Sequence, residues 1–143
     1  MDKKMLEIYD LIGEGYKPLV DYGEWRVAFL RYIDDLQPDQ IKEMERHTET
    51  DEVFVLIHGR GVLLVGGVGT RVERIYPQIM EFGKIYNVKR NAWHAVLLSR
   101  DASILLVENR NTGRLNSEYT SLSKEQHQFI MEQASLLEPS SFD

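Results

Sequence analysis

Three polar side chains that suit metal or acid–base chemistry lie close together in this sequence: Glu45, His47 and Glu52. Glu45 and His47 are two residues apart in a segment predicted to be a strand, so their side chains should share one face. A turn through residues 48–51 would bring Glu52, at the start of the next strand, beside them. Carboxylate oxygens and imidazole nitrogens both bind Mn, Fe, Ni and Zn ions. The segment therefore predicts half of a metal or small-molecule site.

A fourth candidate, His94, comes much later in the chain, between the apolar residues Trp93 and Ala95. An imidazole in such surroundings needs a partner, because an unpaired polar group is costly to bury. His94 is then either a hydrogen-bonded core histidine or a ligand that completes the first group. For Glu45 and His47 the alternative to a ligand is an exposed side chain on the surface of the protein.

The elements that must position these residues are short strands. Alternating apolar and polar residues, rich in β-branched and aromatic types, predict strands with Gly, Asp and Ser turns between them. The predicted strands are residues 24–33, 45–47, 52–57, 62–65, 71–76, 80–88, 93–98 and 103–107. Pro77 is expected to end the strand before it. Turn signals every 8–12 residues are typical of a β-sandwich or β-barrel.

The two ends of the chain have a different character. Residues 3–12 are unevenly apolar and predict a short amphipathic turn or helix. Near the other end, Ser123 and Gln126 have the spacing of a capping box, and apolar residues follow at helical spacing. We predict a helix over about residues 124–137, covering a sheet face or a barrel end.

The composition of the chain limits the kinds of molecule that it is expected to bind. Its 143 residues are enough for one domain, and its formal net charge of −6 argues against binding nucleic acid or an anionic membrane surface. Without cysteine, the chain has no disulfide, thiolate ligand or cysteine nucleophile. Its first residues form neither a signal peptide nor a membrane span, so the expected location is the cytoplasm.

Two segments, residues 45–61 and 83–94, resemble the two motifs of the cupin family. The first family motif is His-x-His, then Glu, then Gly, and here Glu45, His47, Glu52 and Gly59 stand at those places. The second family motif ends in Pro-x-Gly-x-x-His, and here it ends at His94. The resemblance implies an all-β fold, a jelly-roll barrel or double-stranded β-helix over about residues 17–112, within a single cupin domain of residues 1–143.

The resemblance also implies metal ligands. His47, Glu52 and His94 take ligand positions, and Glu45 stands where the family has its first histidine. Lys89 and Asn91 replace the Pro and Gly of the second motif, although Asn also tolerates a left-handed turn. A site with two carboxylates and two imidazoles would suit Mn, Fe, Zn or Ni, and it would weaken as the histidines become protonated.

Four further residues are candidates for contact with a bound molecule. The aromatic side chains of Phe54 and Tyr86 could line a pocket, although aromatic residues on strands commonly belong to the core. Glu108 and Arg110 end an apolar strand and could donate or accept hydrogen bonds at a barrel mouth, or could simply be solvated.

Two functions fit these observations. One is a metal-dependent enzyme acting on a small polar molecule, sugar-like or a keto or hydroxy acid, with Glu45 and Glu52 as catalytic carboxylates in isomerase or epimerase chemistry. The other is a non-catalytic module that binds or senses a small ligand at a degenerate metal site. The resemblance and the exposed strand edges together predict a homodimer.

Overall fold

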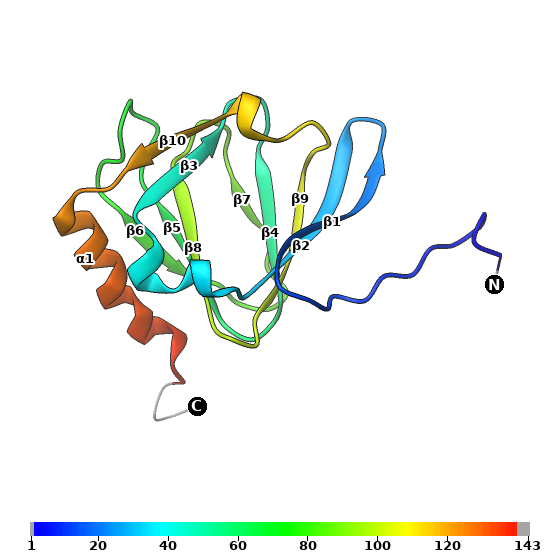
Figure 1. The fold of residues 1–143 in the computed structure, drawn as a ribbon, viewed down its shortest axis with the longest axis horizontal. Coiled ribbons are helices and arrows are strands. Elements are labelled where there is room, and N and C mark those ends of the chain that lie inside the picture. Colours follow the sequence, from blue (N-terminus) through cyan, green and yellow to red (C-terminus); the bar gives the residue numbers. More distant parts are fainter. Residues whose placement is uncertain (1, 140–143) are drawn as a thin grey trace.

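The computed structural model describes residues 2–139 as two antiparallel five-stranded sheets that face each other, with one helix beside them (Figure 1). The first sheet has the order β1-β2-β9-β4-β7 and the second β10-β3-β8-β5-β6. The strands are β1 Gly15–Tyr22, β2 Trp25–Arg31, β3 Glu43–His47, β4 Glu52–His58, β5 Gly61–Val65, β6 Tyr76–Ile79, β7 Tyr86–Val88, β8 His94–Leu98, β9 Ser103–Asn109 and β10 Ser117–Ser121. The all-β prediction is therefore confirmed.

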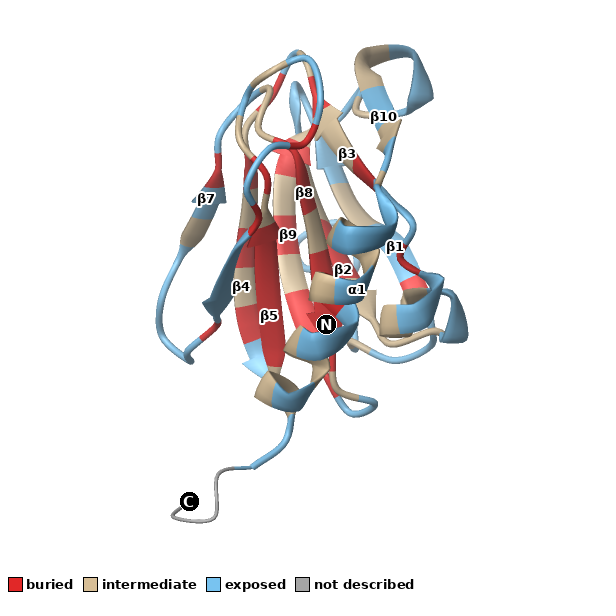
Figure 2. Cartoon of the chain, turned by 90° about the vertical axis from the view of Figure 1, so that its left-hand side faces the viewer, coloured by how far each residue is buried: buried red, intermediate tan, exposed pale blue. Residues whose placement is uncertain are grey.

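Side chains alternate between the two faces of each strand, and this alternation produces two apolar layers. One set of side chains points between the sheets, with Phe54, Leu56, Val96 and Ile104 among its members. The intervening residues of the second sheet, such as Leu64, point outward to a second buried layer. Figure 2 shows the resulting pattern, with β4, β5, β8 and β9 carrying most of the buried residues.

The helix α1, Lys124–Glu132, covers the outer face of the second sheet. Its Ile130 is fully buried and packs in the same cluster as Val62, Leu64 and Leu97. Ser123 caps it: its hydroxyl accepts a hydrogen bond from the Gln126 amide, and the Gln126 side chain accepts one from the Ser123 amide. The predicted capped helix is thus present, and its last turn continues as a 3₁₀ helix over Gln133–Leu137.

Residues 3–12 contain a single turn, one of the two alternatives predicted for them, and they run in an extended path away from the barrel (Figure 1). The bounds of two predicted strands were wrong. No strand spans 71–75. Instead Pro77 lies within β6, which tolerates it because an edge strand leaves one row of amides unpaired. In the segment 80–88 only Tyr86–Val88 is a strand, since Gly83 takes a φ of +79° in the turn before it.

Two strands were not predicted, and both supply residues to the interior. β1 precedes the first predicted strand, residues 24–33, and β10 follows the last, residues 103–107. β1 pairs with β2, whereas β10 pairs with β3 and places Ser117 opposite His47. Among the described residues, no helix is long and apolar enough to cross a membrane.

Candidate metal centre

A group of five ionisable side chains lies between the sheets at one end of the barrel, and we call it the acid–histidine cluster: Glu45, His47, Glu52, His94 and Glu108. It follows from the alternation of the strands. The inward-facing residues of β4 run Glu52, Phe54, Leu56, and those of β8 run His94, Val96, Leu98. Each strand is therefore polar at one end of its inner face and apolar at the other.

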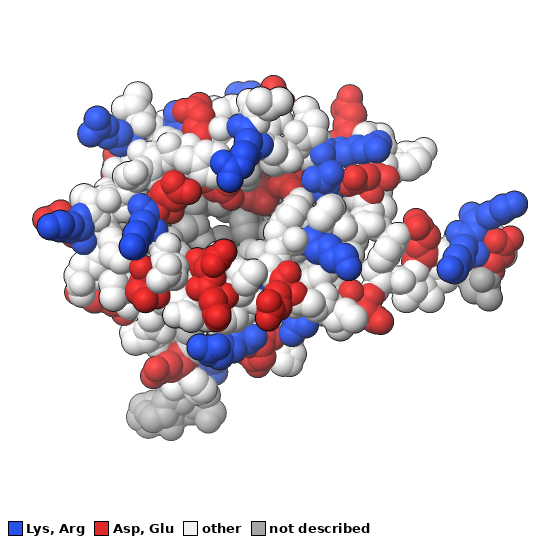
Figure 3. All heavy atoms as spheres, in the orientation of Figure 1, with Lys and Arg blue, Asp and Glu red and all other residues white. Residues whose placement is uncertain are grey.

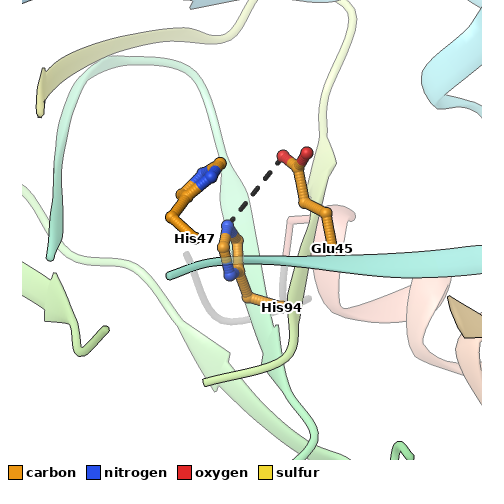
Figure 4. A group of neighbouring side chains, drawn as sticks. All are labelled: Glu45, His47 and His94. Carbon is orange, nitrogen blue, oxygen red and sulfur yellow. Dashed lines mark ion pairs between the residues drawn. The ribbon is translucent and has the colours of Figure 1, made fainter. Parts of the chain in front are cut away.

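Strand pairing brings the polar ends together. Glu45 on β3 lies opposite His94 on β8, and the pairing of Val53 with Val107 puts Glu52 and Glu108 at the same end of β4 and β9. Figure 4 shows the side chains of Glu45, His47 and His94 directed toward one another. Their ligand atoms lie within 4.8 Å of one another, and the same holds for a second group that consists of His47, Glu52 and Glu108.

The turn before His94 depends on Asn91, whose φ of +70° is left-handed. Asn tolerates this conformation better than most residues, because its short side chain can bond locally. The Asn91 amide donates a hydrogen bond to the His47 carbonyl oxygen, which joins the second motif to the first. The replacement of the family's glycine by asparagine therefore preserves the turn.

Both imidazoles direct Nε2 toward Glu52. The Glu52 Oε1 atom lies 3.2 Å from Nε2 of His47 and 3.2 Å from Nε2 of His94. On the far side of the ring, His94 Nδ1–H donates to the Ala92 carbonyl oxygen at 3.0 Å, and His47 Nδ1 lies 2.8 Å from the Ser117 hydroxyl. Because a carbonyl can only accept, the His94 Nδ1 carries the proton, and its Nε2 is left to face the cluster.

These contacts explain the charge states of the metal-free cluster. Burial raises the pKa of Glu52, but its hydrogen bonds with the two histidines and their charge outweigh burial and lower this pKa to about 2. Burial lowers the pKa of His47 and of His94, but the bond to Glu52 and its charge reverse this, so both pKa values are raised. Without a metal ion, Glu52 thus stabilises the protonated form of each imidazole.

Glu108 is the buried carboxyl of the cluster that accepts a hydrogen bond from Tyr16 rather than from a histidine. Burial and the negative charge of Glu52 raise the pKa of Glu108 to about 7, although a hydrogen bond from Tyr16 opposes the shift. The Tyr16 hydroxyl donates to Glu108 Oε1 at 2.6 Å, and its own pKa is raised by burial and by this bond. Tyr16 comes from β1 and Ser117 from β10, so sequence reasoning that missed these strands could not find their roles.

The cluster lies in a cavity of about 510 Å³. Its wall is apolar around Leu30, Val96 and Leu106 and polar elsewhere, where Arg114 and Tyr119 contribute. Figure 3 shows the molecule in the orientation of Figure 1. The face in view has a hollow near its middle, bordered mainly by acidic side chains. The lining includes the acids Asp35, Glu43, Glu45, Glu52 and Glu108.

Of the four residues predicted to touch a ligand, two line this cavity. Phe54 forms part of the wall, its ring edge-on to His94 with centroids 6.0 Å apart, and Glu108 belongs to the cluster. Tyr86 packs against the apolar layer between the sheets, and its hydroxyl accepts a hydrogen bond from the Glu81 amide. Arg110 pairs with Asp21 at 3.8 Å and is half exposed. Tyr86 and Arg110 are therefore not among the residues that line the cavity.

The donor set fits a divalent first-row metal ion. Two imidazole nitrogens and up to three carboxylate oxygens converge, and second partners orient both rings, as is usual for metal-binding histidines. The described residues thus contain two overlapping groups that could hold a metal ion, and both include His47.

Comparison with known proteins agrees with the fold. A cupin-2 domain protein from Shewanella frigidimarina superimposes with a TM-score of 0.50 at 15% identity, covering 70% of this chain and 86% of that one. The iron(II) form of HppE gives 0.51 at 14% identity, covering 65% of this chain and 48% of HppE. The capsular polysaccharide assembling protein CapF from Staphylococcus aureus gives 0.56 at 10% identity, covering 81% of this chain and 34% of CapF.

The protein thus has a small cupin fold, as the two motifs predicted. At these identities the likeness concerns the fold alone. Comparison by sequence finds no matching family model and no matching curated protein.

Proposed function

We propose that the acid–histidine cluster binds a divalent metal ion and that the cavity around it binds a small polar molecule. The observation that carries this proposal is the convergence of His47, His94 and Glu45 within 4.8 Å, with Glu52 bonded to both rings. His47 and His94 would bind through Nε2, and Glu45 and Glu52 through carboxylate oxygens. Mn, Fe, Zn and Ni suit such a mixed nitrogen and oxygen set.

The electrostatics of the cavity favour a neutral, hydroxylated molecule. Five acidic residues line it against two basic ones, so a free carboxylate would be repelled unless it lay beside Lys42, Arg114 or the cluster. Hydroxyl groups can instead donate to these carboxylates. We therefore rank a sugar-like molecule ahead of a keto or hydroxy acid as the ligand.

Isomerase or epimerase chemistry is the reaction class that the residues support best. It requires a base that removes a proton from carbon next to a carbonyl group. Glu45 is the member of the cluster with the most exposed side chain, 40%, and it faces the cavity, so its carboxylate can reach a bound molecule once it has detached from the metal. A bound metal ion would supply Lewis-acid polarisation of the carbonyl oxygen.

A second candidate is a binding or sensing module without turnover. Glu45 favours this alternative, because it stands where the cupin motif has a histidine, and such a change can accompany loss of catalysis. In that case the same cavity would bind the ligand and leave it unchanged.

Elemental analysis of protein purified without chelator tests the proposal. We expect about one equivalent of a divalent metal in the wild-type protein and much less in His94→Ala, because Nε2 of His94 is a central ligand. His58→Ala is the matched control, since His58 is exposed and pairs only loosely with Asp101 at 3.9 Å. Metal-free native protein that is not stabilised by added Mn, Fe, Ni or Zn would refute metal binding. Metal without turnover of sugars would favour the binding module.

A further inference from the structure

A second cavity, of about 470 Å³, lies at the end of β2, between the residues that precede β1 and the turn between β8 and β9. Because neighbouring residues on a strand point to opposite faces, Leu30 lines the cavity of the acid–histidine cluster whereas Arg31 lines the second one. The two cavities share no lining residue. We call the second one the arginine cavity, because Arg31 and Arg100 are its two basic residues.

Arg31 lacks the partners that such a side chain normally has. Its Nε atom is buried without a hydrogen-bond partner, and no ion pair within residues 2–139 involves it. Arg26, on the same strand, instead pairs with Asp21 at 2.7 Å. Arg46 also has a buried Nε without a partner, but its other nitrogens donate to Gly69 and to Glu118. A buried guanidinium donor without an acceptor is costly, and an acceptor in this cavity would lie beside the Arg31 guanidinium group.

Arg100 reaches the same cavity from the turn between β8 and β9. Its guanidinium carbon lies 5.1 Å from the centroid of the Tyr32 ring. Stacking on a ring face leaves the N–H groups, which lie in the guanidinium plane, able to donate sideways. The cavity is thus lined by two guanidinium groups that form no ion pair with a carboxylate of the described chain.

We propose that the arginine cavity binds the oxyanion group of a small hydroxylated molecule. Phosphate and carboxylate both match the planar pair of donors that a guanidinium presents. Glu14 and Asp34 also line the cavity, and their carboxylates disfavour a multiply charged anion but accept hydrogen bonds from hydroxyl groups. A sugar monophosphate or a hydroxy acid has this combination of groups. The site is separate from the metal centre and does not depend on it.

An NMR titration of the chelator-treated full-length chain tests the proposal, because it locates binding by residue. The probes are inorganic phosphate and acetate, with sodium chloride of equal ionic strength as the reference. We expect saturable shifts of the amide signals of Glu14, Tyr32 and Ile33 with at least one probe. The probe that binds more tightly tells whether the natural ligand carries phosphate or carboxylate.

The variants Arg31→Gln and Arg100→Gln should each weaken this binding about tenfold, the factor expected for one hydrogen bond to a charged group. Arg74→Gln is the matched control, since Arg74 also lies 5.1 Å over a tyrosine ring, that of Tyr76, but outside this cavity. Arg100 is exposed, so its variant should fold even if Arg31→Gln does not. Shifts that do not saturate with either probe, or that are equal in Arg100→Gln and wild type, would overturn the proposal.

Discussion

At the scale of single residues, the cluster combines charges that differ in how they respond to pH. Glu52 forms hydrogen bonds with two histidines, whereas Glu108 lies beside the Glu52 charge and accepts a hydrogen bond from Tyr16. The spacing of the motifs was sufficient to predict that His47, Glu52 and His94 converge. It could not place Glu108 in the cluster, because that depends on the pairing of β4 with β9, which brings residues more than fifty positions apart together.

The first prediction concerns Glu108→Gln in metal-free protein. The pKa of Glu108 is about 7 in the folded state, against an ordinary value of 4.5. The folded state therefore binds the proton more tightly than the unfolded state does. The stability that this provides is present at low pH and is lost as the pH rises from 4.5 to about 7. The amide is neutral and can still accept from Tyr16. Urea unfolding should show the variant more stable than wild type by on the order of 2 kcal/mol at about pH 8, and nearly equal to it at about pH 5.

The histidines add a slope of the same sign. Their raised pKa values contribute stability below the unfolded value of 6.5, and this stability is lost as pH rises through the folded values. Glu108→Gln should therefore flatten the pH dependence without abolishing it. An unchanged slope in the variant would show that Glu108 is already ionised across this range.

The second prediction concerns Glu45→Gln. If Glu45 is a ligand, replacing its carboxylate should weaken metal binding at least about tenfold. This is a lower limit, because even a residue that only forms a hydrogen bond with a metal ligand contributes about tenfold to metal affinity. Isothermal titration calorimetry with Mn²⁺ and Zn²⁺ measures this. Glu43→Gln is the control, since Glu43 lies on the same strand and lines the same cavity but belongs to neither ligand group. Equal losses in the two variants would mean that Glu45 acts only through its charge.

At the scale of elements, the pattern of apolar residues predicted the central strands correctly but failed at the edges of the sheets. The strands β4, β8 and β9 around the cluster were predicted because apolar residues run along most of their length. β1 and β10 were missed, since both are edge strands with mostly exposed side chains and no strong apolar pattern. The segment 71–75 alternates like a strand, yet it forms a loop, and its Val72 and Ile75 are buried beneath α1 instead.

The turn between β4 and β5 supports the third prediction. Gly59 has a φ of +74°, and a Cβ atom there would lie 2.7 Å from the Ala102 backbone. Gly59→Ala should lower the free energy of unfolding by about 2–4 kcal/mol, the combined cost of a left-handed residue and of overpacking. Chemical denaturation measures it. Gly113→Ala is the control, because nothing lies within 4 Å of its Cβ position, and it should change little.

A smaller loss in Gly59→Ala, similar to that of Gly113→Ala, would show that the turn relaxes easily. The glycine of the first motif would then not be needed to hold β4 in place. Because Glu52 begins β4, metal affinity in the same variant should fall together with stability if the turn positions the cluster.

At the scale of the whole molecule, the edges of the sheets bear on the predicted homodimer, the fourth prediction. β6 and β7 are edge strands, and the exposed apolar residues Ile79, Phe82 and Ile85 lie on them and on the connection between them. Exposed apolar residues beside unpaired strand edges favour contact with a second copy. Sedimentation velocity should report a dimer for the wild type and a monomer for Phe82→Asp combined with Ile85→Asp.

Leu115→Asp is the control for this experiment. Leu115 is fully exposed and lies next to β10, at the opposite edge of the second sheet from β6. A wild-type monomer at all concentrations would contradict the predicted homodimer. A dimer that Leu115→Asp dissociates while the double variant does not would place the contact at the other edge.

The central claim is that the acid–histidine cluster binds a divalent metal ion, and anomalous X-ray scattering from crystals grown with Mn²⁺ or Zn²⁺ tests it most directly. The fifth prediction is one strong anomalous peak at about 2.0–2.3 Å from Nε2 of both His47 and His94, the usual distance for such bonds. The peak should also lie within bonding distance of a carboxylate oxygen of Glu45 or Glu52. Crystals of the metal-soaked protein with peaks only at exposed carboxylates, and none between the two imidazoles, would contradict the claim.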